Sequence, residues 1–264
     1  MRAALCLASA LLALPAATGA GELVTIPTRP GVTQSYFLVT APKGEPAAVA
    51  ILMPGGDGNI RMRIEDGQPR FGPRNFVVRI RGMLAERGVA GAILDVPSDQ
   101  SGGMSDGFRA SAEHATDVRA VIADLDRRLG PRPTFLLTTS RSTISGAHLG
   151  RALGVEIAGV ILTSTLWQRG GRNPYPVLSR FDFTSIRAPL LLVHHREDSC
   201  VATPYREAAR LAERFALISV RGGRPPESDD CEPFAPHGFF GREEEVTAAM
   251  VAWMLRRPFA REIE

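Results

Sequence analysis

The sequence predicts an α/β protein in which a mostly parallel sheet is flanked by helices. Short apolar runs rich in Val, Ile and Leu alternate along the chain with segments whose apolar residues recur at helical spacing. Several runs end directly in turns rich in Gly, Pro and Asp, as buried parallel strands do where they open onto a site. The stretch 135–149, FLLTTSRSTISGAHL, joins one such run to a helix through a sharp turn with Ser140 at its apex.

Residues 1–20 predict a secretory signal peptide. One positive charge at Arg2 precedes an apolar run over 3–14, and small residues follow up to Ala20, near which we expect cleavage. The apolar run is too short to span a membrane. We therefore expect an exported protein, periplasmic or secreted; the alternative is a buried N-terminal helix.

The composition fits one globular domain over residues 21–264. The chain of 264 residues is 44% hydrophobic and 22% charged, with a formal net charge of +3, and this length suffices for one large core. Basic residues are scattered among acids, and no basic cluster is interleaved with aromatic residues. Nucleic acid is therefore not expected as a partner.

The elements of the first half follow from these patterns. We expect, in chain order, edge strands over 23–26 and 35–40, a buried strand over 47–53, a loop over 61–72, a helix that starts at Pro73 and is terminated by Gly88, a strand over 89–96, and a long amphipathic helix capped by Ser111 and extending to Leu129. The buried strand ends in the turn PGGDG over 54–58. No G-K-[ST] follows this turn, which excludes a P-loop.

The second half continues the alternation. We expect a strand over 133–139, a helix over 141–153, strands over 157–163 and 189–194, a helix over 204–215, a last strand over 216–220, a loop over 222–236 and a helix over 243–256. The segment 166–187 has no clear period and is short, which favours an open cleft with a minimal lid or none. Its aromatic residues either line a substrate pocket or pack on the sheet; they are Trp167, Tyr175, Phe181 and Phe183.

Three residues from separate segments form a candidate catalytic triad. A serine hydroxyl becomes an effective nucleophile when an imidazole takes its proton and a carboxylate orients that imidazole. Ser140 lies at the strand-to-helix turn, Asp198 follows the apolar run LLLV, and His237 precedes the last helix. All three positions are expected at the carboxyl edge of the sheet, and Glu197 is the alternative acid.

The turn around Ser140 departs from the usual pattern G-x-S-x-G. Thr138 and Ser142 occupy the places that glycine usually holds. The alternative to a nucleophile is an ordinary turn in which Ser140 or Ser142 caps the helix.

With these residues, the sequence resembles the α/β-hydrolase superfamily. The chain order Ser, Asp, His is that of the superfamily, and the segment TSRST is similar to the T-S-R-G-T turn of its small bacterial exported serine hydrolases. The resemblance implies an oxyanion hole of two backbone N–H groups, which fall on Arg141 and on Gly56, with Asp57 the neighbouring candidate.

Two cysteines remain after removal of the leader. In an oxidising compartment, Cys200 and Cys231 are expected to form one disulfide that ties the Asp198 loop to the His237 loop. Two free buried thiols are the alternative.

The other polar candidates have weaker patterns. His194 is expected in the core or behind the site, and no H-E-x-x-H or paired-cysteine spacing links it or its neighbour His195 to a metal. His114 and Asp117 lie one helical turn apart and are expected to be an exposed pair or cap partners. Two acids near a strand end either shape the pocket or hydrogen-bond within their loop; they are Asp95 and Asp99.

These residues together predict a serine-dependent hydrolase of carboxylic esters that needs no cofactor and no metal. The alternatives are a peptidase or amidase on the same fold, and a catalytically idle binding protein. The expected partner is a small-molecule ester, and the oligomeric state stays open.

Overall fold

Strands and helices alternate along the chain as predicted. The computed structural model describes residues 21–41, 44–66, 68–72, 74–169 and 175–264, and the expected signal peptide lies outside them. The strands are β1 Gly21–Arg29, β2 Val32–Val39, β3 Ala48–Met53, β4 Arg63–Glu65, β5 Gln68–Arg70, β6 Val89–Leu94, β7 Thr134–Thr139, β8 Gly159–Thr163, β9 Gln168–Arg169, β10 Tyr175–Pro176, β11 Leu190–His195, β12 Ala216–Val220 and β13 Glu262–Ile263. The helices are α1 Phe76–Arg79, α2 Arg81–Glu86, α3 Asp106–Arg109, α4 Ala112–Leu129, α5 Thr143–Leu153, α6 Tyr205–Leu211 and α7 Glu243–Met254.

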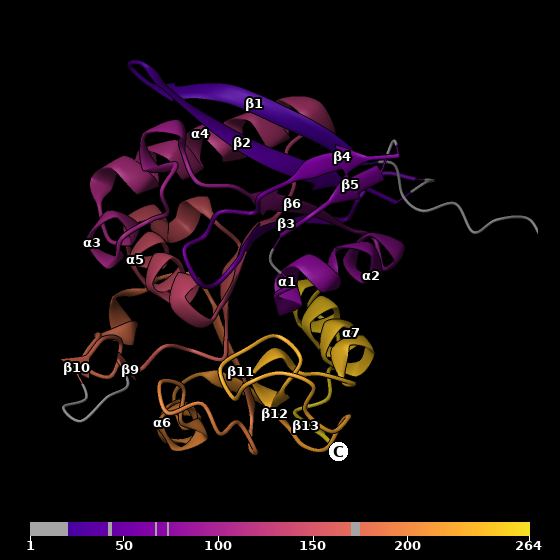
Figure 1. Cartoon of the computed structure of the whole chain (residues 1–264), viewed down its shortest axis with the longest axis vertical. Helices are drawn as coiled ribbons and strands as arrows, with labels where there is room; N and C mark the ends of the chain where they lie inside the picture. Colours follow the sequence, from indigo (N-terminus) through magenta and orange to yellow (C-terminus); the bar gives the residue numbers. More distant parts are fainter. Residues whose placement is uncertain (1–20, 42–43, 67, 73, 170–174) are drawn as a thin grey trace, which may run out of the picture.

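Within the described residues, nine strands form one twisted sheet at the centre of the molecule (Figure 1). The strand order is β1-β2-β6-β3-β7-β8-β11-β12-β13. β1, β2 and β6 pair antiparallel, and every pairing from β6 to β13 is parallel. The prediction of a mostly parallel sheet is therefore confirmed.

Helices cover both faces of this sheet. α4, α5 and α6 pack on one face, and α1, α2 and α7 pack on the other (Figure 1). Strands β3, β6, β7, β8 and β11 are consequently buried along their whole length, which explains why they appear in the sequence as unbroken apolar runs. Ser111 caps α4 as expected, since its side chain accepts a hydrogen bond from the N–H of His114. Each helix in the described part of the chain is too short or too polar to cross a bilayer.

Three expectations about elements were wrong. The presumed loop 61–72 contains the hairpin β4–β5, the short helix α3 was not expected, and β12 is not the last strand. The last strand is β13, which adds two residues to the sheet edge beside Ser219 and Val220. All of these elements have four residues or fewer, too few to show a period.

Candidate active site

The backbone of Ser140 has a strained conformation at the strand-to-helix turn. Ser140 directly follows β7 and has φ 54°, in the left-handed region that non-glycine residues seldom adopt. The turn after β3 passes close beside it: a Cβ on Gly55 would lie 3.0 Å from the Cβ of Ser140 and 3.1 Å from the carbonyl oxygen of Thr139. Glycine is required at 55 because of this approach.

The threonine two residues before Ser140 fits because the adjacent helix supplies the missing space. Thr138 is fully buried, and its hydroxyl donates a hydrogen bond to the carbonyl of Ile161 at 3.2 Å. A Cβ on Gly146 of α5 would lie 2.6 Å from the Oγ1 of Thr138. The close contact of strand and helix that glycine usually allows at the strand is thus provided by glycine in the helix.

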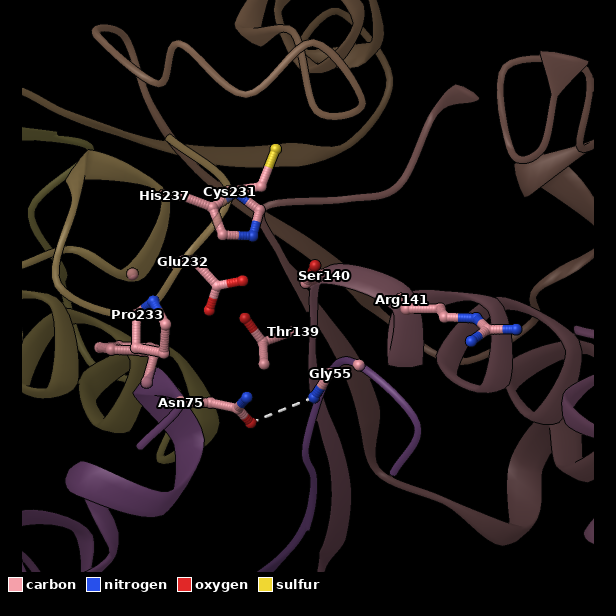
Figure 2. Close-up of a pocket in the computed structure, with 12 residues that line it drawn as sticks. Gly55, Asn75, Thr139, Ser140, Arg141, Cys231, Glu232, Pro233 and His237 are labelled. Atoms are coloured by element: carbon pink, nitrogen blue, oxygen red, sulfur yellow. Dashed lines mark hydrogen bonds between the residues drawn. The ribbon is translucent and has the colours of Figure 1, made fainter. Parts of the chain in front are cut away.

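Ser142, the other departure from the usual pattern, stabilises the turn. Its Oγ accepts a hydrogen bond from the N–H of Thr139 at 2.9 Å and lies 2.6 Å from the carbonyl oxygen of Met53 at the end of β3. Ser142 is therefore the serine that caps this turn, whereas the side chain of Ser140 faces a cavity (Figure 2).

His237 and Asp198 form a buried pair at the same edge of the sheet. The Nδ1 of His237 lies 3.1 Å from the Oδ2 of Asp198, and the two side chains are 6% and 0% exposed. Asp198 also accepts hydrogen bonds from the hydroxyl of Thr203 at 2.8 Å and from the N–H of Cys200 at 3.0 Å. Because these groups hold the carboxylate beside Nδ1, the proton of neutral His237 is placed on Nδ1 and its Nε2 is left as a base.

Ser140 and His237 line one cavity of about 180 Å³. Figure 2 shows a ring nitrogen of His237 directed toward Ser140 across this space. Nε2 is buried and has no hydrogen-bond partner among the described residues, so the two groups face each other without a bond, as is common in ligand-free sites. The lining residues are Gly55, Gly56, Asn75, Phe76, Thr139, Ser140, Arg141, Cys231, Glu232, Pro233, His237 and Gly238.

The glycine turn is held so that Gly56 faces the cavity. The N–H of Gly55 donates to the Oδ1 of Asn75 at 3.1 Å, shown as a dashed line in Figure 2. The guanidinium of Arg109 donates to the carbonyl of Gly56 at 3.0 Å. Gly56 and Arg141 both line the cavity, and Asp57 is not among its lining residues. This arrangement favours Gly56 over Asp57 as an oxyanion donor.

The sequence did not identify Arg109 and Asn75 as parts of the site. Arg109 is fully buried, and burial lowers its pKa to about 10, so that it stays protonated at neutral pH. No carboxylate pairs with it in the described ranges of the chain. Arg109 is the last residue of α3, which the sequence did not predict, and the sequence carries no signal that this arginine lies beneath a turn. Asn75 precedes α1 and has no distinctive pattern either.

The remaining acids and histidines near the strand end have structural contacts. Glu197 is exposed and accepts a hydrogen bond from the N–H of Gly222 at 3.1 Å, so the acid beside His237 is Asp198 and not Glu197. The Nε2 of His195 lies 2.9 Å from the carbonyl oxygen of Gly222. His194 is fully buried against Thr165, and burial lowers its pKa to about 3.

The expectation of an exposed pair at 114 and 117 was wrong. His114 and Asp117 are both fully buried. The Nε2 of His114 lies 3.1 Å from the hydroxyl of Ser145, and burial lowers the pKa of His114 to about 3. Asp117 accepts hydrogen bonds at 2.9 Å from Arg29 of β1. The β1–β2 hairpin packs over this face of α4, which a helical period alone does not indicate.

Asp95 and Asp99 contact other segments of the chain and do not shape the pocket. Asp95 accepts hydrogen bonds from the N–H groups of Ile60 and Val96 at 3.0 and 2.8 Å, and Asp99 pairs with Arg29 at 2.9 Å. Neither lines the cavity.

The aromatic residues of 166–187 pack on the sheet. Trp167 is buried against His194 and Phe183, and Phe181 packs on Phe183. None of these lines the cavity at Ser140, and the side chain of Tyr175 lies outside the described residues. In the described part of this segment, regular structure is limited to β9, β10 and a 3₁₀ turn at Phe183–Ser185, which agrees with the expected minimal lid.

The predicted disulfide between Cys200 and Cys231 is present. It joins the loop of Asp198 to the loop of His237 across a separation of 31 residues. The sulfur of Cys200 comes within 4.8 Å of ligand atoms of Asp198 and His237. Because this sulfur is in the disulfide and the other two groups bond to each other, the cluster is poorly suited to a metal.

No protein-family model and no curated protein matches the chain. Solved structures do match. Est1E from Butyrivibrio proteoclasticus is 15% identical, with a TM-score of 0.60 over 89% of this chain and 98% of that one. The esterase domain of a Rhodothermus marinus protein is 17% identical, with a TM-score of 0.58 over 90% and 98%. A serine hydrolase without a lid from Xanthomonas campestris is 13% identical, with a TM-score of 0.57 over 93% and 97%.

These likenesses define the class of fold. The chain has the α/β-hydrolase fold, with a mostly parallel sheet flanked by helices. At such low identity the similar structures establish the fold alone. The chemistry depends on the residues of the site.

Proposed function

We propose that the protein is a serine hydrolase that cleaves carboxylic esters through an acyl-enzyme on Ser140. The main support for this proposal is the arrangement of Ser140, His237 and Asp198 at one cavity. Ser140 sits on left-handed backbone at the end of β7, and it faces a His237 imidazole whose Nδ1 is held by buried Asp198. The esterases and the serine hydrolase among the similar structures agree with this reaction class.

The residues have distinct roles in the proposed reaction. Nε2 of His237 takes the proton of Ser140 as Oγ attacks the ester carbonyl carbon, and Asp198 stabilises the imidazolium that results. The N–H groups of Gly56 and Arg141 hold the oxyanion of the tetrahedral intermediate. His237 then gives its proton to the departing alcohol. Water, deprotonated by His237, attacks the acyl-enzyme; His237 then returns this proton to the Oγ of Ser140 as the acid is released.

The fixed turn and the small cavity agree with this assignment. Asn75 and Arg109 hold the Gly55–Gly56 turn from two sides, so its amides are oriented before substrate binds. A volume of about 180 Å³ favours short or compact substrate groups next to the reacting carbon.

The proposal is tested by turnover of a series of p-nitrophenyl esters of increasing acyl length. Replacement Ser140→Ala is expected to lower kcat by about 10³-fold or more, while Ser101→Ala, at an exposed serine away from the cavity, leaves it unchanged. Full turnover by folded Ser140→Ala would refute the assignment.

The same assay separates the alternatives. Faster turnover of aminoacyl anilides than of esters would identify a peptidase or amidase. Absence of turnover on both, together with no labelling by a fluorophosphonate, would identify an idle binding protein.

We also propose that the protein is exported after cleavage of its predicted leader. The predicted leader lies outside the described residues. The disulfide supports export, because such bonds persist in oxidising compartments.

A further inference from the structure

Glu232 brings a carboxylate to the cavity that the proposed reaction does not use. It lines the same cavity as Ser140 and His237. In Figure 2 its carboxylate projects into the space between the His237 ring and Thr139, on the side that faces Ser140. A substrate bound at Ser140 would therefore lie beside it.

The chain on both sides of Glu232 is fixed. Cys231 is joined by the disulfide to Cys200. The carbonyl of Pro233 accepts a hydrogen bond at 3.0 Å from Arg79, and Gly238 packs so closely that a Cβ there would lie 2.0 Å from that carbonyl oxygen. The carboxylate is thus presented from a constrained segment.

Two nearby cations, Arg79 and Arg141, are already paired, and a third, Arg74, stacks on the ring of Phe234. Arg79 forms an ion pair with Glu243 at 2.8 Å. Arg141 forms one with Asp106 at 2.7 Å, and its side chain points away from the cavity in Figure 2. In the described portions of the chain, no arginine lies within ion-pairing distance of Glu232.

The part of the loop next to Glu232 is rich in acids. Its sequence over 227–232 is ESDDCE, and all of these residues except Ser228 are exposed at the surface. Within the described residues, none of its acids takes part in an ion pair. The segment that contributes Glu232 to the cavity wall therefore carries negative charge that no ion pair neutralises within the described residues.

We propose that Glu232 selects esters that carry a positively charged group, an ammonium or a guanidinium, near the scissile bond. This inference rests on the proposed esterase function. A cation beside an unpaired carboxylate gains Coulomb energy that a neutral group of equal size does not. An anionic ester is disfavoured for the same reason.

Two isosteric pairs of substrates test the proposal. Acetylcholine and 3,3-dimethylbutyl acetate differ only in the charge on the alcohol. The p-nitrophenyl esters of 4-(trimethylammonio)butyrate and 5,5-dimethylhexanoate differ only in the charge on the acyl group. In at least one pair, kcat/KM is expected to be about five-fold higher for the cationic ester at low ionic strength, and the preference falls in high salt.

The variant Glu232→Gln is expected to reduce this ratio to about one. Glu213→Gln, an identical change at an exposed residue outside the cavity, keeps the preference. Equal turnover of both members in both pairs, or a preference that persists in Glu232→Gln, would overturn the inference while the esterase function stands. Absence of Ser140-dependent turnover of every ester would overturn both.

Discussion

At the scale of single residues, the position of Gly56 depends on one buried arginine. Arg109 donates to the carbonyl of Gly56 at 3.0 Å and lies beneath the turn without a carboxylate partner in the described chain. A neutral side chain there leaves this carbonyl without its donor and lets the turn relax. In the proposed mechanism, the N–H of Gly56 would then bind the oxyanion less well, and this hydrogen bond matters most in the transition state.

We therefore expect Arg109→Met to lower kcat by on the order of 10- to 100-fold with little change in KM. Arg109→Lys, which keeps a donor and a charge, should recover part of the loss. Steady-state kinetics on a short ester, with thermal unfolding as a check of folding, provides the measurement. Loss of stability with kcat unchanged would show that Arg109 has a structural role alone.

The sequence predicted which side chains meet at this edge of the sheet better than the residues that support them. Ser140, Asp198 and His237 each lie beside a strand or helix end that the apolar pattern marks, so they could be assigned to one sheet edge. Arg109 and Asn75 form hydrogen bonds with backbone groups of a turn that is distant in the sequence. No pattern in the amino-acid sequence indicates such a contact.

At the scale of elements, β7 and α5 pack closely because a larger side chain in the strand faces a glycine in the helix. The usual turn places glycine in the strand, whereas this chain places Thr138 in the strand and Gly146 in the helix. A search for glycine at 138 misses this compensation because it occurs eight residues further along.

Gly146→Ala is expected to destabilise the protein by about 1–3 kcal/mol, because the new methyl group overlaps Thr138 and Leu162. In the double variant Thr138→Ala/Gly146→Ala, the overlap with Thr138 is gone, so the combined loss should be smaller than the sum of the two single losses. Urea unfolding of the four proteins measures this coupling. Strict additivity would contradict the proposed match between strand and helix.

The buried parallel strands were the most predictable elements, since each is covered on both faces and is apolar throughout. The hairpin β4–β5 and the edge strand β13 were not predicted. These strands are two or three residues long, and they are defined by the strands with which they pair. A short stretch of sequence does not indicate its pairing partner.

At the scale of the whole molecule, two buried histidines make stability depend on pH. Burial lowers the pKa values of His114 and His194 to about 3, below the ordinary value of 6.5. Below pH 6.5 the unfolded chain binds protons that the folded chain does not. This contribution to stability is complete above about pH 6.5 and is lost as the pH falls toward 3.

By pH 5, each histidine should cost about 2 kcal/mol of the free energy of unfolding. His114→Gln cannot take up a proton and should lose correspondingly less stability than wild type between pH 7.5 and pH 5. Urea unfolding at the two pH values checks this, and an identical pH dependence in both proteins would contradict it.

We propose that Ser140 is a nucleophile activated by His237 at one edge of the sheet, and mass spectrometry of the folded protein after reaction with a fluorophosphonate tests this. One adduct is expected, on the peptide that contains Ser140, together with a loss of labelling on the order of 10³-fold in His237→Ala. An unmodified folded protein, or an adduct on another serine that persists in Ser140→Ala, would contradict it.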